Sequence, residues 1–247
     1  MLSLLDQKPV GKYRPFVQFS NTSTDQRDFW SPWFRLIVFI LAATSIWCLL
    51  AEFYGLCSMR TFTLLISLPA LLTLSVLTFA DHACGNRRLW RGVLIGSIAG
   101  LLAAVAYDVF RLPFVFADSL GIDKVVPSLR LFKVFPRFGA MILGQPMEQT
   151  SYSLAAHLTG WAYHFSNGLT FGIMYLAAIG DASRRHWIWA VVMAVGLELG
   201  MLLTPYPSVF GIHTTSTFIA VTMAAHVVFG VALGLLALRF SKTLGPC

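Results

Sequence analysis

Long apolar runs separated by short polar connections set the pattern of this chain. Six of these runs are long enough to cross a bilayer as α-helices, which takes about 20 residues each. The expected spans are residues 33–55, 61–80, 91–110, 155–179, 187–204 and 217–239. The pattern therefore predicts an all-α protein, a polytopic membrane helix bundle with six transmembrane helices.

The connections between the runs divide the chain into three parts. A polar and basic arm comes first, without the apolar stretch and cleavage site of a signal peptide, so we expect the first span to direct insertion. A two-helix hairpin and a four-helix membrane core follow. The expected bounds are 1–32 for the arm, 33–80 for the hairpin and 81–247 for the core.

The longest connection, residues 111–152, joins the third and fourth spans. Within it, the segment "SLRLFKVFPRF" places Arg130, Lys133 and Arg137 at positions i, i+3 and i+7, and apolar residues fill the remaining face. This spacing is typical of an amphipathic helix that lies along a membrane surface. We expect the connection to form an interfacial lid over the core.

The composition supports a membrane protein. The chain is 57% hydrophobic and 12% charged, and its mean hydropathy is +0.71, whereas soluble domains carry about 25% charged residues. The net charge of +7 does not indicate nucleic-acid binding, because no recognition motif accompanies it. The four cysteines show neither a metal-binding nor a disulfide-framework spacing.

The distribution of lysine and arginine predicts the orientation. Many of these residues lie in the N-terminal arm, in the second and fourth connections and at the C-terminus, whereas the short loops 56–60 and 205–216 contain Arg60 alone. The long connection 111–152 is an exception with five such residues, and long loops follow the charge rule weakly. Cytoplasmic loops carry the excess of positive charge in membrane proteins. We therefore expect a multi-pass protein with both termini in the cytoplasm and the lipid bilayer as its first partner.

Ionisable residues occur within or beside the last four predicted spans, although a charged group inside a membrane costs about 2.5–3.5 kcal/mol. They are Asp108, His157, His164, Glu198 and His226, and the six-span model places all of them in the outer half of the bilayer. Such groups persist only if they face the bundle interior and find partners. We expect them to surround a polar pocket within the core.

Further residues extend this predicted pocket. Tyr175 lies on the same face of its helix as His164. Arg111 and His213 lie in the connections next to the spans, and we expect them at the pocket mouth. A stripe of small residues, typical of close helix packing, leads to Asp108 in steps of four. The stripe consists of Gly96, Gly100 and Ala104.

The chemistry of this predicted pocket has several interpretations. His164, Glu198 and His226 supply the two histidines and one carboxylate that hold iron or zinc in many proteins, so a transition metal is one expectation. A histidine in the membrane also suits haem or a chlorophyll-type pigment. The three residues come from different helices, so no local motif decides among these cofactors.

Three segments of the core resemble the YagU-like group of small polytopic inner-membrane proteins. They read "YHFSNGLTFGIMY", "HWIWAVVMAVGLELGMLLTPYPSVFGI" and "AAHVVFGVALG". The matching residues are His164, Phe165, Ser166, Tyr175, Trp187 or Trp189, Pro205, Pro207 and His226, with Asp108 and Pro113 in the upstream segment "GLLAAVAYDVFRLPF". The resemblance covers roughly residues 91–240 and leaves out the first two spans. It implies a four-helix core in a bacterial inner (plasma) membrane and no particular reaction.

The leading functional expectation is a non-enzymatic membrane protein whose outer-half pocket binds or passes a small solute, a proton or a metal ion. Histidine suits proton transfer because it titrates near neutral pH. One alternative is an accessory subunit of a larger membrane complex, associated with other subunits or with itself and holding a pigment or haem. Another is a membrane-embedded metalloenzyme that acts on a lipid or quinone.

Overall fold

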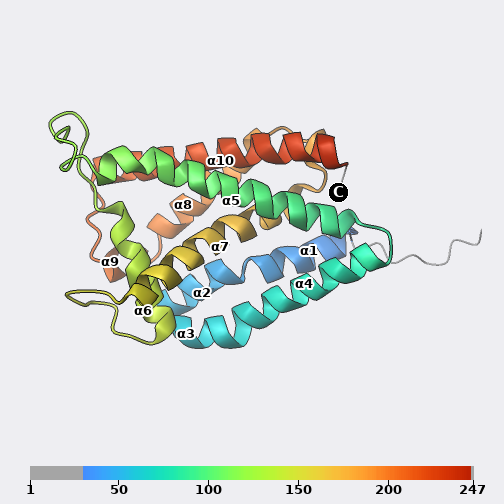
Figure 1. The fold of residues 1–247 in the computed structure, drawn as a ribbon, viewed down its shortest axis with the longest axis horizontal. Helices are drawn as coiled ribbons and strands as arrows, with labels where there is room; N and C mark the ends of the chain where they lie inside the picture. Colours follow the sequence, from blue (N-terminus) through green and yellow to red (C-terminus); the bar gives the residue numbers. More distant parts are fainter. Residues whose placement is uncertain (1–29, 246–247) are drawn as a thin grey trace, which may run out of the picture.

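The computed structural model describes residues 30–245, which fold mainly into helices and contain no β-strand (Figure 1). The predicted all-α class is confirmed for this part of the chain. The predicted arm lies outside the described residues except for residues 30–32, and so does Cys247. The elements in chain order are α1 (Pro32–Ala42), α2 (Thr44–Phe53), α3 (Met59–Phe62), the π-helix η1 (Thr63–Ser67), α4 (Leu68–Ala83), α5 (Arg88–Val115), the 3-10 helix η2 (Leu131–Lys133), α6 (Val134–Leu143), α7 (Leu154–Ile179), the 3-10 helix η3 (Ala182–Arg184), α8 (Ile188–Leu202), α9 (Tyr206–Val209) and α10 (Ser216–Leu244).

Several of these helices are candidates to span a membrane. Three runs are long and apolar enough, namely Met59–Ala83, which joins α3, η1 and α4, then α5, and α10. The helices α1 and α2 form a fourth candidate if they are counted together as one broken span. These candidates are fewer than the six spans predicted. α7 has the length, with 26 residues, but falls short in hydropathy, whereas α8 is apolar but only 15 residues long.

The first predicted span is not one continuous helix, because α1 and α2 meet at a bend of 48°. The Thr44 hydroxyl donates to the carbonyl of Leu41 at 3.0 Å. Ser45 shares a hydrogen bond of 3.2 Å with Thr170 of α7. Hydroxyl side chains that bond to the preceding turn bend helices, so Thr44 accounts for the break, and Ser45 ties the bent segment to α7.

The second predicted span is longer than expected and contains the π-helical turn η1. Pro69 lies at the start of α4, where it cannot donate a backbone hydrogen bond to the preceding turn. The wider π-turn directly before it accommodates this missing donor. The helical run continues on both sides of η1, from Met59 to Ala83.

α7 lies at the centre of the bundle and packs against α1, α5 and α6 (Figure 1). α5 and α7 run antiparallel and cross where small residues meet. A Cβ atom on Gly96 would lie 2.7 Å from the carbonyl oxygen of Gly172, and one on Gly168 would lie 2.6 Å from Cβ of Ala104. The predicted small-residue stripe is thus confirmed as a packing surface, and it brings the end of α5 close to the first half of α7.

α8 and α10 form a second close crossing, and α10 also packs against α5. Gly230 and Gly234 of α10 contact the backbone of Ala190, Val191 and Trp187. A side chain at either glycine would hold the two helices apart. The start of α8 therefore lies against the middle of α10, and the later turns of α8 run beside the first half of α10, where Glu198 lies near His226.

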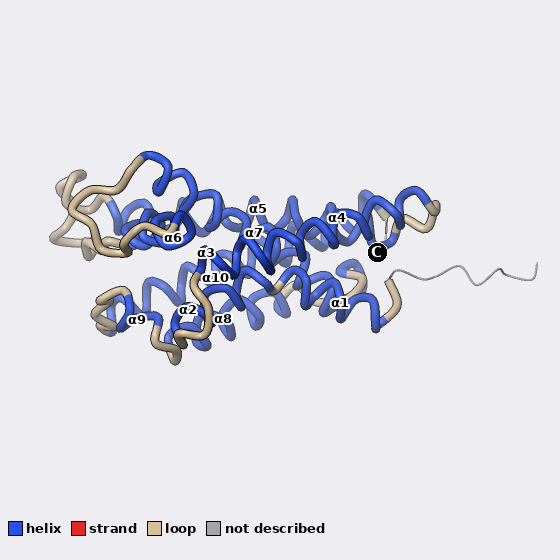
Figure 2. Tube along the Cα trace, turned by 90° about the horizontal axis from the view of Figure 1, so that it is seen from below, coloured by secondary structure: helices blue, strands red, loops and turns tan. Residues whose placement is uncertain are grey.

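The predicted interfacial helix is shorter than the segment that suggested it. Arg130 precedes the turn η2, and α6 begins only at Val134. α6 is packed into the bundle, because Gly139 meets the backbone of α7 at Gly160, with no room for a Cβ atom on either residue. α6 and α9 lie at the same end of the bundle, opposite the start of α1 and the end of α10, and Figure 2 shows the long connection from α5 to α6 at that end.

Candidate functional site

A cavity of about 170 Å³ lies inside the bundle toward the end that carries α6 and α9. Residues of α2, α5, α6, α7, α8, α9 and α10 form its wall. We call it the central pocket. Its polar and ionisable lining residues are Tyr107, Arg111, His164, Asn167, Glu198, Tyr206 and His226, and aliphatic and phenylalanine side chains form most of the remainder.

The first polar group of this pocket combines Asp108, Arg111 and His164. Nε2 of His164 lies 2.8 Å from Oδ2 of Asp108, and a guanidinium nitrogen of Arg111 donates to Oδ1 at 3.3 Å. Another guanidinium nitrogen donates to the Leu131 carbonyl at 2.9 Å. Asp108 is 8% exposed and Arg111 is 5% exposed, so the two opposite charges are withdrawn from solvent together.

The second polar group is the pair Glu198 and His226, with Oε2 and Nε2 3.5 Å apart. Nδ1 of His226 lies 2.9 Å from the carbonyl of Thr222, one turn earlier on α10. A carbonyl only accepts, so Nδ1 carries a hydrogen, and Nε2 of the neutral ring is then an acceptor. A carboxylate and this nitrogen are both acceptors. The pair therefore needs one proton, held either by the carboxyl group or by the imidazole.

Tyr107 joins the two groups. Its ring centroid lies 5.0 Å from that of His226 and 6.0 Å from that of His164. The guanidinium carbon of Arg111 lies 4.6 Å from the centroid of the same ring, a cation–π contact. The Tyr107 ring therefore lies in contact with both groups.

Two further polar residues line the pocket. Burial raises the pKa of the Tyr206 phenol, which keeps this group protonated near neutral pH. Oδ1 of Asn167 is buried and has no hydrogen-bond partner among the described residues. A buried amide oxygen without a partner costs free energy that a bound solute or water would recover.

The charges of the pocket balance. Arg111 offsets Asp108, to which it is hydrogen bonded. One proton on the pair Glu198 and His226 makes that pair neutral overall, whichever partner holds it. A set without net charge avoids most of the cost of placing ions in a poorly solvated interior.

The structure brings together Asp108, His164, Glu198 and His226, four of the predicted pocket residues. We expected Arg111 at the pocket mouth, but it lies deeper in the bundle, because its guanidinium group is buried beside Asp108.

Three other predicted residues lie elsewhere. Tyr175 is packed in the apolar core and is 1% exposed. It shares a face of α7 with His164, but eleven residues of helix separate them by about 16 Å. His157 lines a different cavity, and His213 is exposed in the connection before α10. Helical spacing identifies a shared face but not a shared depth.

The predicted metal site is not present as proposed. Within residues 30–245, no three histidine, cysteine, aspartate or glutamate side chains are grouped as a metal site requires. His164 is paired with Asp108 rather than with Glu198 and His226. The positive charge of the Arg111 guanidinium also disfavours the binding of a metal cation beside it. The pocket is also smaller than the roughly 300–1,000 Å³ typical of small-molecule sites, so a haem or chlorophyll-type macrocycle does not fit.

Sequence reasoning missed several polar residues. Tyr107, Asn167 and Tyr206 line the central pocket, but only Tyr107 had a visible signal, as the sequence neighbour of Asp108. Asp81 is fully buried at the opposite end, where Oδ2 accepts the backbone N–H of Trp90 at 3.0 Å in the first turn of α5. A carboxylate at a helix N-terminus is stabilised by the exposed N–H groups, so this residue has a structural explanation.

Comparisons with protein-family models, with curated proteins and with solved structures found no match. The resemblance to the YagU-like group stays a prediction from the sequence.

Proposed function

We propose that this chain is an integral membrane protein whose central pocket binds a small polar solute together with an exchangeable proton. The pair Glu198 and His226 holds the proton, and the aromatic wall and Arg111 orient the solute. A cavity of about 170 Å³ has room for several waters or one small molecule. The proposal names no metal ion, because the ligand set for one is not assembled.

One observation carries this proposal. The hydrogen bond from Nδ1 of His226 to the Thr222 carbonyl leaves Nε2 facing Glu198 as a second acceptor. Both side chains line the cavity, so a solute or water inside it has direct access to the proton between them. The groups that face this pair from neighbouring elements are Tyr107 and Arg111 of α5, His164 of α7 and Tyr206 of α9.

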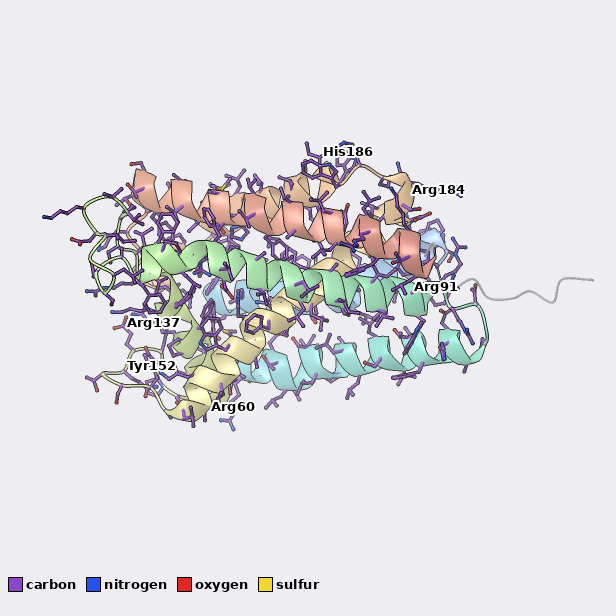
Figure 3. All side chains as sticks on the ribbon, turned by 45° about the horizontal axis from the view of Figure 1, so that its top comes forward. Arg60, Arg91, Arg137, Tyr152, Arg184 and His186 are labelled. Carbon is purple, nitrogen blue, oxygen red and sulfur yellow. The ribbon has the colours of Figure 1, made fainter. Side chains whose placement is uncertain are left out.

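The proposal includes six membrane crossings, formed by α1 with α2, by α3 through α4, and by α5, α7, α8 and α10. α7 is surrounded by α1, α5 and α6, so it needs less apolar surface than a helix that faces lipid. Figure 3 shows Arg91 and Arg184 at the end of the bundle opposite Arg137 and Tyr152. With the positive-inside rule, this supports a cytoplasmic location for the Arg91 end and for both termini. The proposed compartment is the inner (plasma) membrane, as the resemblance implies.

The test is infrared difference spectroscopy on protein reconstituted in lipid, recorded as the pH is stepped. We expect a carboxylic acid C=O band whose intensity follows the pH, because the proton moves on and off Glu198. Glu198→Gln should abolish this band, since an amide N–H satisfies Nε2 of His226 without an exchangeable proton.

The matched control is Glu148→Gln, which removes an exposed carboxylate outside the central pocket. This variant should keep the pH-dependent band. A wild-type spectrum without such a band, or one that Glu198→Gln leaves unchanged, would reject the proposed function.

A further inference from the structure

A second cavity, of about 610 Å³, lies at the end of the bundle that carries α6. Its volume is within the roughly 300–1,000 Å³ typical of small-molecule sites. We call it the basic pocket. The lining residues that matter here are Arg130, Lys133, Arg137, Tyr152, His157 and Trp161.

The charge of this pocket is strongly one-sided. Three cationic side chains line it, and no acidic side chain of the described residues does. The side chains of Arg130 and Lys133 are exposed and have no hydrogen-bond or ion-pair partner in the described part of the chain. Arg137 donates to the Phe210 carbonyl at 2.7 Å and lies 3.7 Å from Glu148, whose side chain is 73% exposed. Concentrated positive charge on a concave wall attracts anions.

The backbone that carries two of these cations is held in place. Leu131 lies between Arg130 and Lys133 and is buried. Its carbonyl accepts the 2.9 Å hydrogen bond from the buried guanidinium of Arg111. Binding a ligand here therefore costs less free energy for ordering the protein than binding the same ligand to a mobile loop would cost.

The remaining wall suits a molecule with an organic part. Trp161 and Phe132 pack edge to face at a centroid distance of 5.3 Å, and both line the cavity. The ring of Tyr152 packs against that of His157 at 6.2 Å. Tryptophan and tyrosine are typical of the interface between membrane and water, where the polar groups of lipids lie.

We propose that the basic pocket binds a phosphate-bearing molecule. A phosphate monoester carries about −1.5 to −2 charges at pH 7, and the phosphodiester of a phospholipid headgroup carries a single negative charge. Either group presents several anionic or acceptor oxygens to the three cations. Arginine and lysine both bind phosphate oxygens through charge-assisted hydrogen bonds. The molecule is either the headgroup of an anionic phospholipid or a phosphorylated solute. The inference goes beyond the proposed function, because no residue of the central pocket takes part.

The experiment uses the full chain and a double variant, Arg130→Gln with Lys133→Gln. Both side chains are exposed and unpaired among the described residues, so the variant should fold, and a thermal unfolding curve checks this. The control is Lys124→Gln with Arg185→Gln, two exposed residues outside both pockets that remove the same charge. Two probes distinguish a phosphorylated solute from a phospholipid headgroup. Glycerol phosphate is titrated in neutral detergent, and retention of phosphatidylglycerol is counted by native mass spectrometry after release from mixed nanodiscs.

We expect the double variant to weaken binding of one probe by about tenfold or more, since each charge-assisted hydrogen bond lost costs about that factor, whereas the control binds like wild type. Loss of glycerol phosphate binding identifies a phosphorylated solute, and loss of phosphatidylglycerol retention identifies a lipid. No binding of either probe by wild type, or an equal effect of the two double variants, would overturn the proposal. Neither outcome tests proton exchange at Glu198. The proposal for the basic pocket can therefore be rejected without rejecting the one for the central pocket.

Discussion

Asp108 and Glu198 are both buried carboxylates next to a histidine, yet their surroundings differ. Asp108 accepts from the Arg111 guanidinium as well as from His164. Glu198 faces His226 at the longer distance of 3.5 Å. Asp108 therefore has a charged hydrogen-bond donor beside it, and the proposed proton site is Glu198, whose neighbour is the His226 imidazole.

The first residue-scale prediction concerns Asp108→Asn. This change leaves the Arg111 guanidinium buried without its counter-charge, which typically costs about 3–5 kcal/mol. Thermal unfolding in detergent should show a clear fall in Tm. Glu148→Gln removes an ion pair whose carboxylate is exposed and should change stability by no more than about 1 kcal/mol. Equal falls in the two variants would contradict a structural role for the buried pair.

At the scale of helices, glycine positions decide which polar residues meet. The α5–α7 crossing at Gly96, Gly100, Gly168 and Gly172 leaves no space for side chains. Close approach of the two backbones is what allows the short side chain of Asp108 to reach His164. The α8–α10 crossing at Gly230 and Gly234 acts in the same way for Glu198 and His226.

The second prediction tests this packing with a matched glycine pair. Gly100→Ala would press a methyl group into the backbone of Gly168, and overpacking of this kind costs about 1–3 kcal/mol. Gly196→Ala on α8 meets nothing within 4 Å and should be neutral or stabilising by up to about 1 kcal/mol. Tm in detergent measures both. The packing explanation fails if Gly196→Ala is the more destabilising of the two.

The whole molecule presents an apolar belt between two polar ends. Large exposed apolar side chains run along η1 and α4, including Leu65, Leu72, Val76 and Phe79, which are 62–70% exposed. Lipid tails are an ordinary environment for such a surface, because they match its polarity. The arginines labelled in Figure 3, Arg60, Arg91, Arg137 and Arg184, lie toward the two ends of the bundle.

The third prediction follows from this arrangement and the six proposed crossings. Lys124→Cys and Arg185→Cys should lie on opposite faces of the membrane. They are made separately in a chain in which Cys57, Cys84 and Cys247 are replaced by serine, so that the buried Cys48 is the one natural cysteine left. A maleimide that cannot cross membranes, applied to right-side-out vesicles, should label only the Lys124→Cys variant until the membrane is opened. Labelling of both variants in sealed vesicles would rule out the six-span topology.

Much of the element scale was predictable from hydropathy. The expected run at 155–179 corresponds closely to α7, and that at 217–239 lies within α10. Hydropathy was less informative where a side chain alters the hydrogen bonding of the helix backbone. The break at Thr44 and the π-turn before Pro69 depend on single hydrogen bonds, which an average over about 20 residues does not register.

The amino-acid sequence by itself determined the helical class and the presence of ionisable groups in apolar runs, because both follow from local composition. Tertiary structure alone decided that His164 pairs with Asp108 and His226 with Glu198, that Tyr175 lies in the core, and that Tyr206 joins the pocket. Depth and pairing across helices depend on where two backbones cross. That position is set by contacts between glycines far apart in the chain, which no one-dimensional pattern contains.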